Sequence, residues 1–142
     1  MNHWLAVLTL AAIPVVAQAE QAEKFGKLEV HYNAMLTSDL LPDVARTYKI
    51  DRSNTRGLVT ISVLRKNAMG VGIPIAAKLS VYTVNLSNQL STVDMREIKE
   101  GAAIYYLGEF RVSPPDTLKF NVSMGASGEP NREVTFTQQF YK

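Results

Sequence analysis

The chain has 142 residues, and its 15 lysines and arginines against 13 aspartates and glutamates give a formal net charge of +2. A charge this close to balance does not indicate a nucleic-acid partner. The chain contains no cysteine, which excludes disulfides, thiol catalysis and zinc–thiolate sites.

Residues 4–16 form an almost unbroken apolar run that leads into Ala17, Gln18 and Ala19. Such a run before small residues is typical of a secretory signal peptide, and it is shorter than the roughly 20 residues that a membrane-spanning helix needs. We therefore expect residues 1–19 to be removed after Ala19, the protein to be exported, and the mature chain to have no membrane span.

Period-two alternation of apolar and polar residues recurs along the remaining chain, and turn residues separate the alternating segments. This pattern predicts half-buried β-strands. The first strand places Leu28, Val30, Tyr32 and Ala34 on one face. Further strands are expected to begin near residues 57, 77, 90, 104, 118 and 134, and the charges within residues 90–98 favour an edge strand there.

One short helix is expected between the first two strands. Residues 37–49 contain Ser38 and Asp39 as candidate N-caps, Pro42 at a permitted early position, and apolar residues at helical spacing.

Seven short strands with little helix predict an all-β fold in residues 20–142. We expect one domain, an antiparallel two-sheet sandwich of the immunoglobulin or fibronectin type. The alternative is a lipocalin-like barrel, which needs eight strands.

Four segments resemble a known family of small exported proteins of Gram-negative bacteria, the domain-of-unknown-function family 4426. They are residues 31–34 (HYNA), 41–48 (LPDVARTY), 52–57 (RSNTRG) and 61–63 (ISV). The resemblance implies a periplasmic β domain. It implies no catalytic residues, and it directs attention to His31 and to the loop from Arg52 to Arg56.

His31 is the one histidine of residues 20–142, and the alternation places it on the polar face of the first strand. A lone histidine does not build a metal site, although histidine and methionine sulfur together can bind copper(I). No methionine stands at a ligand-like spacing, so we expect a surface or cross-strand hydrogen-bonded residue and no metal or other cofactor.

Residues 46–66 carry six basic side chains against Asp51, a local net charge of +5. Arginine side chains match carboxylate and phosphate geometry, so Arg52, Ser53 and Arg56 are candidates for binding an anionic group. The alternative is that both arginines brace the loop by bonding nearby carbonyls and carboxylates. Tyr48 and His31 complete the set of candidate binding residues.

The sequence thus favours a monomeric, non-catalytic periplasmic module that binds an envelope protein or an anionic ligand through the basic loop or through a sheet edge. A small-ligand pocket, between the sheets or under the short helix, or a copper site is the alternative. A hydrolase is the remaining possibility, but the chain has no Gly-x-Ser-x-Gly segment.

Overall fold

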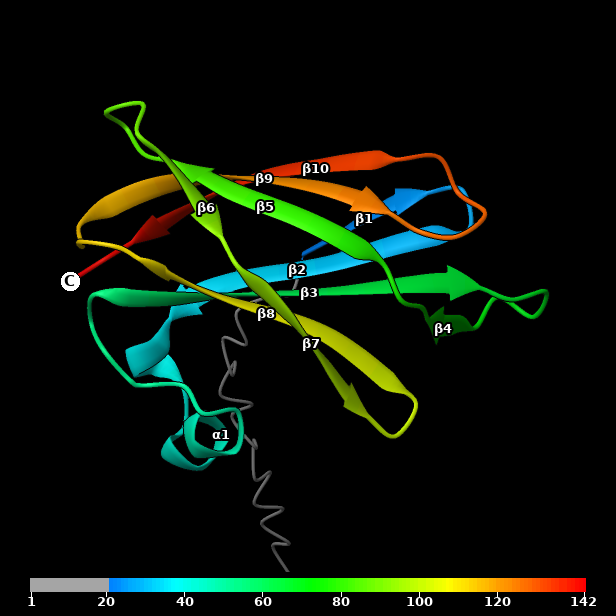
Figure 1. Cartoon of the computed structure of the whole chain (residues 1–142), viewed down its shortest axis with the longest axis horizontal. Helices are drawn as coiled ribbons and strands as arrows, with labels where there is room; N and C mark the ends of the chain where they lie inside the picture. The colour runs from blue at the N-terminus through cyan, green and yellow to red at the C-terminus, as the bar shows by residue number, and fades with distance from the viewer. Residues whose placement is uncertain (1–20) are drawn as a thin grey trace, which may run out of the picture.

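The computed structural model describes residues 21–142, so the expected signal peptide lies outside the described residues. Strands dominate the structure, and the α-helix is short (Figure 1). The elements in chain order are β1 (Gln21–Phe25), β2 (Leu28–Leu36), the 3-10 helix η1 (Thr37–Asp39), α1 (Pro42–Thr47), β3 (Arg56–Lys66), β4 (Gly72–Pro74), β5 (Lys78–Val84), β6 (Leu90–Val93), β7 (Met95–Glu100), β8 (Ala103–Arg111), β9 (Asp116–Gly125) and β10 (Arg132–Phe140).

The strands form two antiparallel sheets that pack face to face. The first sheet has the order β1-β2-β3-β8-β7, with β4 also paired to β3, and the second has the order β10-β9-β5-β6. The expected alternation of β2 is confirmed, because Leu28, Val30 and Ala34 are buried on its inner face. The all-β class and the two antiparallel sheets are thereby confirmed, and two separate sheets exclude the closed barrel.

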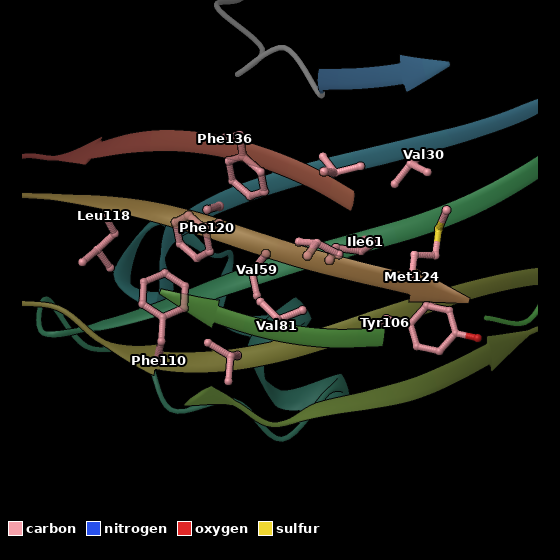
Figure 2. Close-up of a cluster of buried hydrophobic side chains, with 14 of the residues drawn as sticks. Val30, Val59, Ile61, Val81, Tyr106, Phe110, Leu118, Phe120, Met124 and Phe136 are labelled. Atoms are coloured by element: carbon pink, nitrogen blue, oxygen red, sulfur yellow. The ribbon is translucent and has the colours of Figure 1, made fainter. Parts of the chain in front are cut away.

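Aromatic side chains join the two sheets across the core. The ring of Phe120 on β9 is fully buried and stacks on Phe136 of β10, with centroids 4.7 Å apart. Phe136 in turn stacks on Tyr32 of β2 at 4.4 Å, and Phe110 of β8 meets Phe120 edge-on at 5.1 Å. Figure 2 shows the three phenylalanine rings with Val59, Ile61 and Val81 between the layers. In a chain without cysteine, this apolar packing takes the place of disulfides.

The predicted number of seven strands is wrong, because the described residues form ten. β1 is a largely exposed edge strand, joined to β2 by a turn in which Gly26 has φ +62°, and its residues show no clear alternation. β4 has three residues, too few for a periodic signal.

The third added strand comes from a break at Asp94. Before it β6 pairs with β5, and after it β7 pairs with β8, so one predicted strand crosses from the second sheet to the first. Both halves lie at the end of their sheets, as the charges of residues 90–98 predicted.

The short helix α1 lies in the expected place, and Pro42 occupies its first turn. The expected N-caps are wrong, because Leu41 occupies the N-cap position without a side-chain hydrogen bond and Ser38 and Asp39 belong to η1. The segment between β2 and β3, residues 37–55, is called the crossover below. Ala45 and Ile50 anchor it on Leu58 of β3 and Leu107 of β8, on the face away from the main core (Figure 1). In residues 21–142, no helix has the length and apolar character needed to cross a membrane.

Candidate functional site

The five binding residues proposed from the sequence do not gather in one site. His31 lies in the middle of β2, and Tyr48 directly follows α1. Arg52 and Ser53 lie in the loop that leads to β3, where Arg56 is the first residue. His31 and Tyr48 line two different pockets on the outer face of the first sheet, and the other three residues line neither pocket.

The loop residues Arg52 and Ser53 are bonded to the segment that begins the crossover. The Arg52 guanidinium donates a hydrogen bond to the Ser38 carbonyl at 2.8 Å. The Ser53 amide donates to Thr37 Oγ1 at 2.8 Å, and the Thr37 hydroxyl donates back to the Ser53 carbonyl at 3.2 Å. These bonds hold both ends of the crossover together.

The local charge of +5 in residues 46–66 is largely balanced in space. Arg56 lies 3.4 Å from Glu109, Arg65 lies 3.5 Å from Glu129, and Lys66 lies 3.9 Å from Glu29. Arg46 pairs with Asp43 one helical turn away. The acidic partners come from other strands or from outside the stretch, so the sequence count overstates the positive charge of this region.

His31 lies beside a carboxylate on its own strand. Its Nε2 atom is 3.1 Å from Oε1 of Glu29, two residues earlier on the same face. His31 also lines a hollow of about 210 Å³ that extends along β3 and β8, with Ser62 and Tyr105 among the other lining residues.

A second pocket lies between the crossover and the first sheet, and we call it the helix pocket. Its volume is about 250 Å³. The crossover supplies one wall and β2, β3, β7 and β8 supply the other. The lining residues are Met35, Leu40, Val44, Tyr48, Ile50, Leu58, Thr60, Glu100, Tyr105 and Leu107. Tyr105 lines both pockets, so they meet at this residue.

A hydrogen bond between Tyr48 and Glu100 lies at the helix pocket. The Tyr48 hydroxyl donates to Glu100 Oε1 at 2.5 Å, and the Arg96 guanidinium donates to the Tyr48 carbonyl. The hydrogen bond to Glu100 raises the pKa of Tyr48 above its ordinary value of 10.0, and partial burial and the negative charge of Glu100 add to the shift. Tyr48 therefore stays a neutral donor across the physiological range.

Two larger hollows differ from the helix pocket in character. One of about 800 Å³ lies at the ends of β5, β9 and β10 and is lined by the charged residues Lys78, Arg132 and Glu133 among others. Another of about 550 Å³ lies beside the C-terminus, next to Pro114 and Tyr141. The helix pocket has the apolar floor and the few converging polar groups that are characteristic of ligand sites, so it is the candidate site.

The sequence reasoning missed most residues of this site, including Met35, Leu58, Glu100 and Leu107. The sequence did contain a signal for two of these residues, Leu58 and Leu107. Leu58 precedes the inward-facing Val59 and Leu107 follows the inward-facing Tyr106, so both strands carry an apolar residue on the face assigned to solvent. Such off-pattern residues indicate a second covered face.

The model of the family described as "Domain of unknown function (DUF4426)" matches residues 22–142. The chain belongs to the DUF4426 family. A crystal structure of a DUF4426 family protein from Pseudomonas aeruginosa PAO1 is similar to it at 30% sequence identity and a TM-score of 0.73, covering 88% of this chain and 97% of that chain. No curated protein matches this DUF4426 chain.

Two more distant structures share the fold of this DUF4426 protein. FetP of uropathogenic Escherichia coli strain F11, recombinantly expressed in the periplasm, is 11% identical with a TM-score of 0.61, over 87% of this chain and 94% of that chain. A copper-bound variant of FetP is 12% identical with the same TM-score, over 86% and 95%. At this identity the likeness concerns the fold alone.

The Tyr48–Glu100 bond predicts an alkaline titration that a substitution can shift. In the intact protein Tyr48 should titrate above 10.0, and Glu100→Gln should lower its pKa because the charged acceptor is lost. Because the folded pKa is raised, the stability from this bond is present below the unfolded value and lost as the pH rises through the folded value. NMR of tyrosines labelled at Cζ measures each site.

Glu97→Gln is the matched control for this titration. Glu97 accepts a hydrogen bond from Tyr106 at 2.8 Å. Burial is the main cause of the raised pKa of Tyr106; the bond to the Ala77 amide lowers it, and Glu97 raises it further. This variant should lower the pKa of Tyr106 and leave that of Tyr48 unchanged. An unchanged Tyr48 pKa in Glu100→Gln would contradict the assigned cause.

Proposed function

We propose that this DUF4426 protein is a non-catalytic binding protein of the periplasm and that the helix pocket is its ligand site. The observation that carries the proposal is an apolar pocket with one converging tyrosine–carboxylate pair on the outer face of the first sheet. Its volume of about 250 Å³ is below the ~300–1,000 Å³ that drug-sized ligands occupy, so the occupant is a small molecule or a single side chain.

Both walls of the helix pocket are held in place by contacts within the protein itself. The floor belongs to β3 and β8, whose residues Leu58 and Leu107 are buried beneath the crossover. The crossover is fixed by the Arg52–Ser38 bond and by the Ile50 amide, which donates to the Ala45 carbonyl at 2.8 Å. A preformed site loses less conformational entropy on binding, which supports a binding role.

The arrangement around His31 supports binding better than hydrolysis. Ser62 is the cross-strand partner of His31 and Glu29 lies 3.1 Å from its Nε2, which brings serine, histidine and a carboxylate together. An acyl-transfer site also needs backbone N–H groups aimed at the developing oxyanion. Ser62 lies inside β3, which is paired with β2 from Gly57 to Arg65, with β8 up to Ile61 and with β4 from Leu64, so the ladders use most of the backbone amides around it.

A substitution that fills the helix pocket tests the proposal. Val44 lines the pocket from α1, and Val44→Trp should weaken binding of 1-hexanol, a small apolar probe, by about tenfold or more because the indole occupies the cavity. Binding is measured by NMR shifts of the Leu58, Thr60 and Leu107 amides during titration. Leu41→Trp is the matched control, since Leu41 is 70% exposed on the same crossover and does not line the pocket. Equal effects of both variants, or shifts elsewhere, would contradict the proposal.

A second candidate function is strand addition at β10, and the strand order supports it. We propose an immunoglobulin-like topology, because β2-β3-β8-β7 opposite β10-β9-β5 follows the order of strands A-B-E-D opposite G-F-C. β10 is then the final edge strand. It has nine residues, and residues 134–140 (VTFTQQF) carry no charge. Edge strands are usually protected by charge, proline or bulges, so this edge suits an added strand of a partner.

A lysine on the β10 edge should abolish such an interaction. The intact protein would capture a partner from envelope extract in a salt-insensitive way, and Thr137→Lys should lose it because edge lysines oppose strand pairing. Ser123→Lys is the control, since Ser123 is an exposed residue of β9, which is paired on both sides. Retention of the partner by Thr137→Lys would exclude strand addition at β10.

The copper alternative finds little support in the residues around His31. The copper-bound FetP variant shares the fold, and Glu29 beside His31 supplies a second donor. Met35 stands four residues along the same strand, roughly 13 Å away at the usual strand rise, which is too far for one ion. Residues 21–142 contain no group of three histidine, aspartate or glutamate side chains arranged for a metal.

A copper titration with a competing chelator tests this alternative. We expect the purified protein and the His31→Ala variant to take up copper(I) equally, because no soft ligand lines the hollow that His31 shares with Ser62 and Tyr105. Tight binding that depends on His31 would favour the copper site over the helix pocket.

A further inference from the structure

The charge of the helix pocket restricts its ligand. Glu100 is the one lining residue with a formal charge, and every other lining residue is apolar, a tyrosine or Thr60. Glu100 lines the pocket but is itself exposed to solvent, so a bound anion would meet a partly screened, repulsive carboxylate. An anionic ligand is therefore disfavoured at this site.

Two neighbouring cations have their contacts elsewhere. Arg96 donates to the Tyr48 carbonyl, and Lys99 lies 3.5 Å from Glu97. Within the described part of the chain, Glu100 has no cationic side chain at ion-pair distance, and its contact is the neutral Tyr48 hydroxyl. An ionised carboxylate offers about four acceptor positions on its two oxygens, and Tyr48 uses one of them.

The tyrosines favour a cation of an organic kind. Tyr48 and Tyr105 both line the pocket beside Glu100. Aromatic rings beside a carboxylate are the usual surroundings of alkylammonium groups, which the ring faces attract. The apolar floor formed by Met35, Leu58 and Leu107 cannot replace the water shell of an inorganic ion, but it can cover a hydrocarbon chain.

We infer that the helix pocket binds an alkylammonium group, with its charge at Glu100, Tyr48 and Tyr105 and its hydrocarbon part on the floor. The inference rests on the proposed function, because it specifies the ligand of the same pocket. Two sources have this chemistry, a free amine and a lysine side chain of a partner protein. The shared group is a primary ammonium on an unbranched chain.

Three probes of equal chain length separate charge from shape. Hexylammonium should bind about tenfold or more tightly than 1-hexanol, since hydrogen bonds to charged groups contribute more than neutral ones, and hexanoate should bind most weakly. Affinities come from NMR shifts of the pocket amides at constant ionic strength. A Gly-Gly-Lys-Gly-Gly peptide as a fourth probe distinguishes the sources, since shifts of the same amides indicate that a protein side chain can enter.

Two pairs of variants assign the preference to named groups. Glu100→Gln keeps the shape and should remove the preference for hexylammonium over 1-hexanol, whereas Glu133→Gln, an exposed carboxylate on β10, should preserve it. Tyr105→Leu should weaken hexylammonium binding several-fold, and Tyr105→Phe should retain it because phenylalanine keeps a ring face.

The outcomes separate this inference from the proposed function. If hexylammonium binds no more tightly than 1-hexanol, or if Glu100→Gln leaves the preference intact, the inference is wrong while a binding pocket remains. If no probe produces pocket shifts that Val44→Trp removes, both fail. A preference for hexylammonium that disappears in Glu100→Gln supports both.

Discussion

The burial of β3 and β8 on both faces is the constraint on which the rest of the structure depends. On one face Val59 and Tyr106 join the core between the sheets, and on the other Leu58 and Leu107 lie under the crossover. The central strands therefore need two covers, the second sheet and the segment that contains α1. Because the crossover is short, it covers the outer face in part, and the helix pocket lies between it and the sheet.

The sequence predicted the fold well where local pattern determines structure. The alternation in β2, β3 and β9 reflects one-sided burial, and Pro42 marks the start of α1. It failed where a strand is too short or too exposed to show an alternation, and where the chain changes from one sheet to the other. β1 and β4 form because β2 and β3 offer free ladder positions, and the change of sheet at Asp94 follows from the positions of β5 and β8.

The candidate site was harder to predict than the fold because its residues lie far apart in the sequence and come together only in the folded chain. Five candidates came from residue type and local charge, and Tyr48 is the one that lines the helix pocket. Arg56 was a candidate because it lies in a basic stretch, but its acidic partner Glu109 is 53 residues away in the chain and could not be identified from the sequence. Glu100 was unremarkable as a charged residue in an edge strand until the fold placed it beside Tyr48. Which charges pair and which residues line a pocket depend on how the strands are arranged in the sheets, so local sequence does not determine them.

The chain crosses from the second sheet to the first at Asp94, and as a result the two flanks of the molecule end in strands of different length. On that flank the sheets end in strands of four and six residues that follow each other in the chain, whereas the opposite flank ends in the nine-residue β10 and the N-terminal hairpin. A neighbour that extends a sheet has a long template on one flank and an interrupted template on the other. Strand addition at β10, as proposed above, would therefore use one flank, and two molecules joined by it would form a closed pair instead of a fibre.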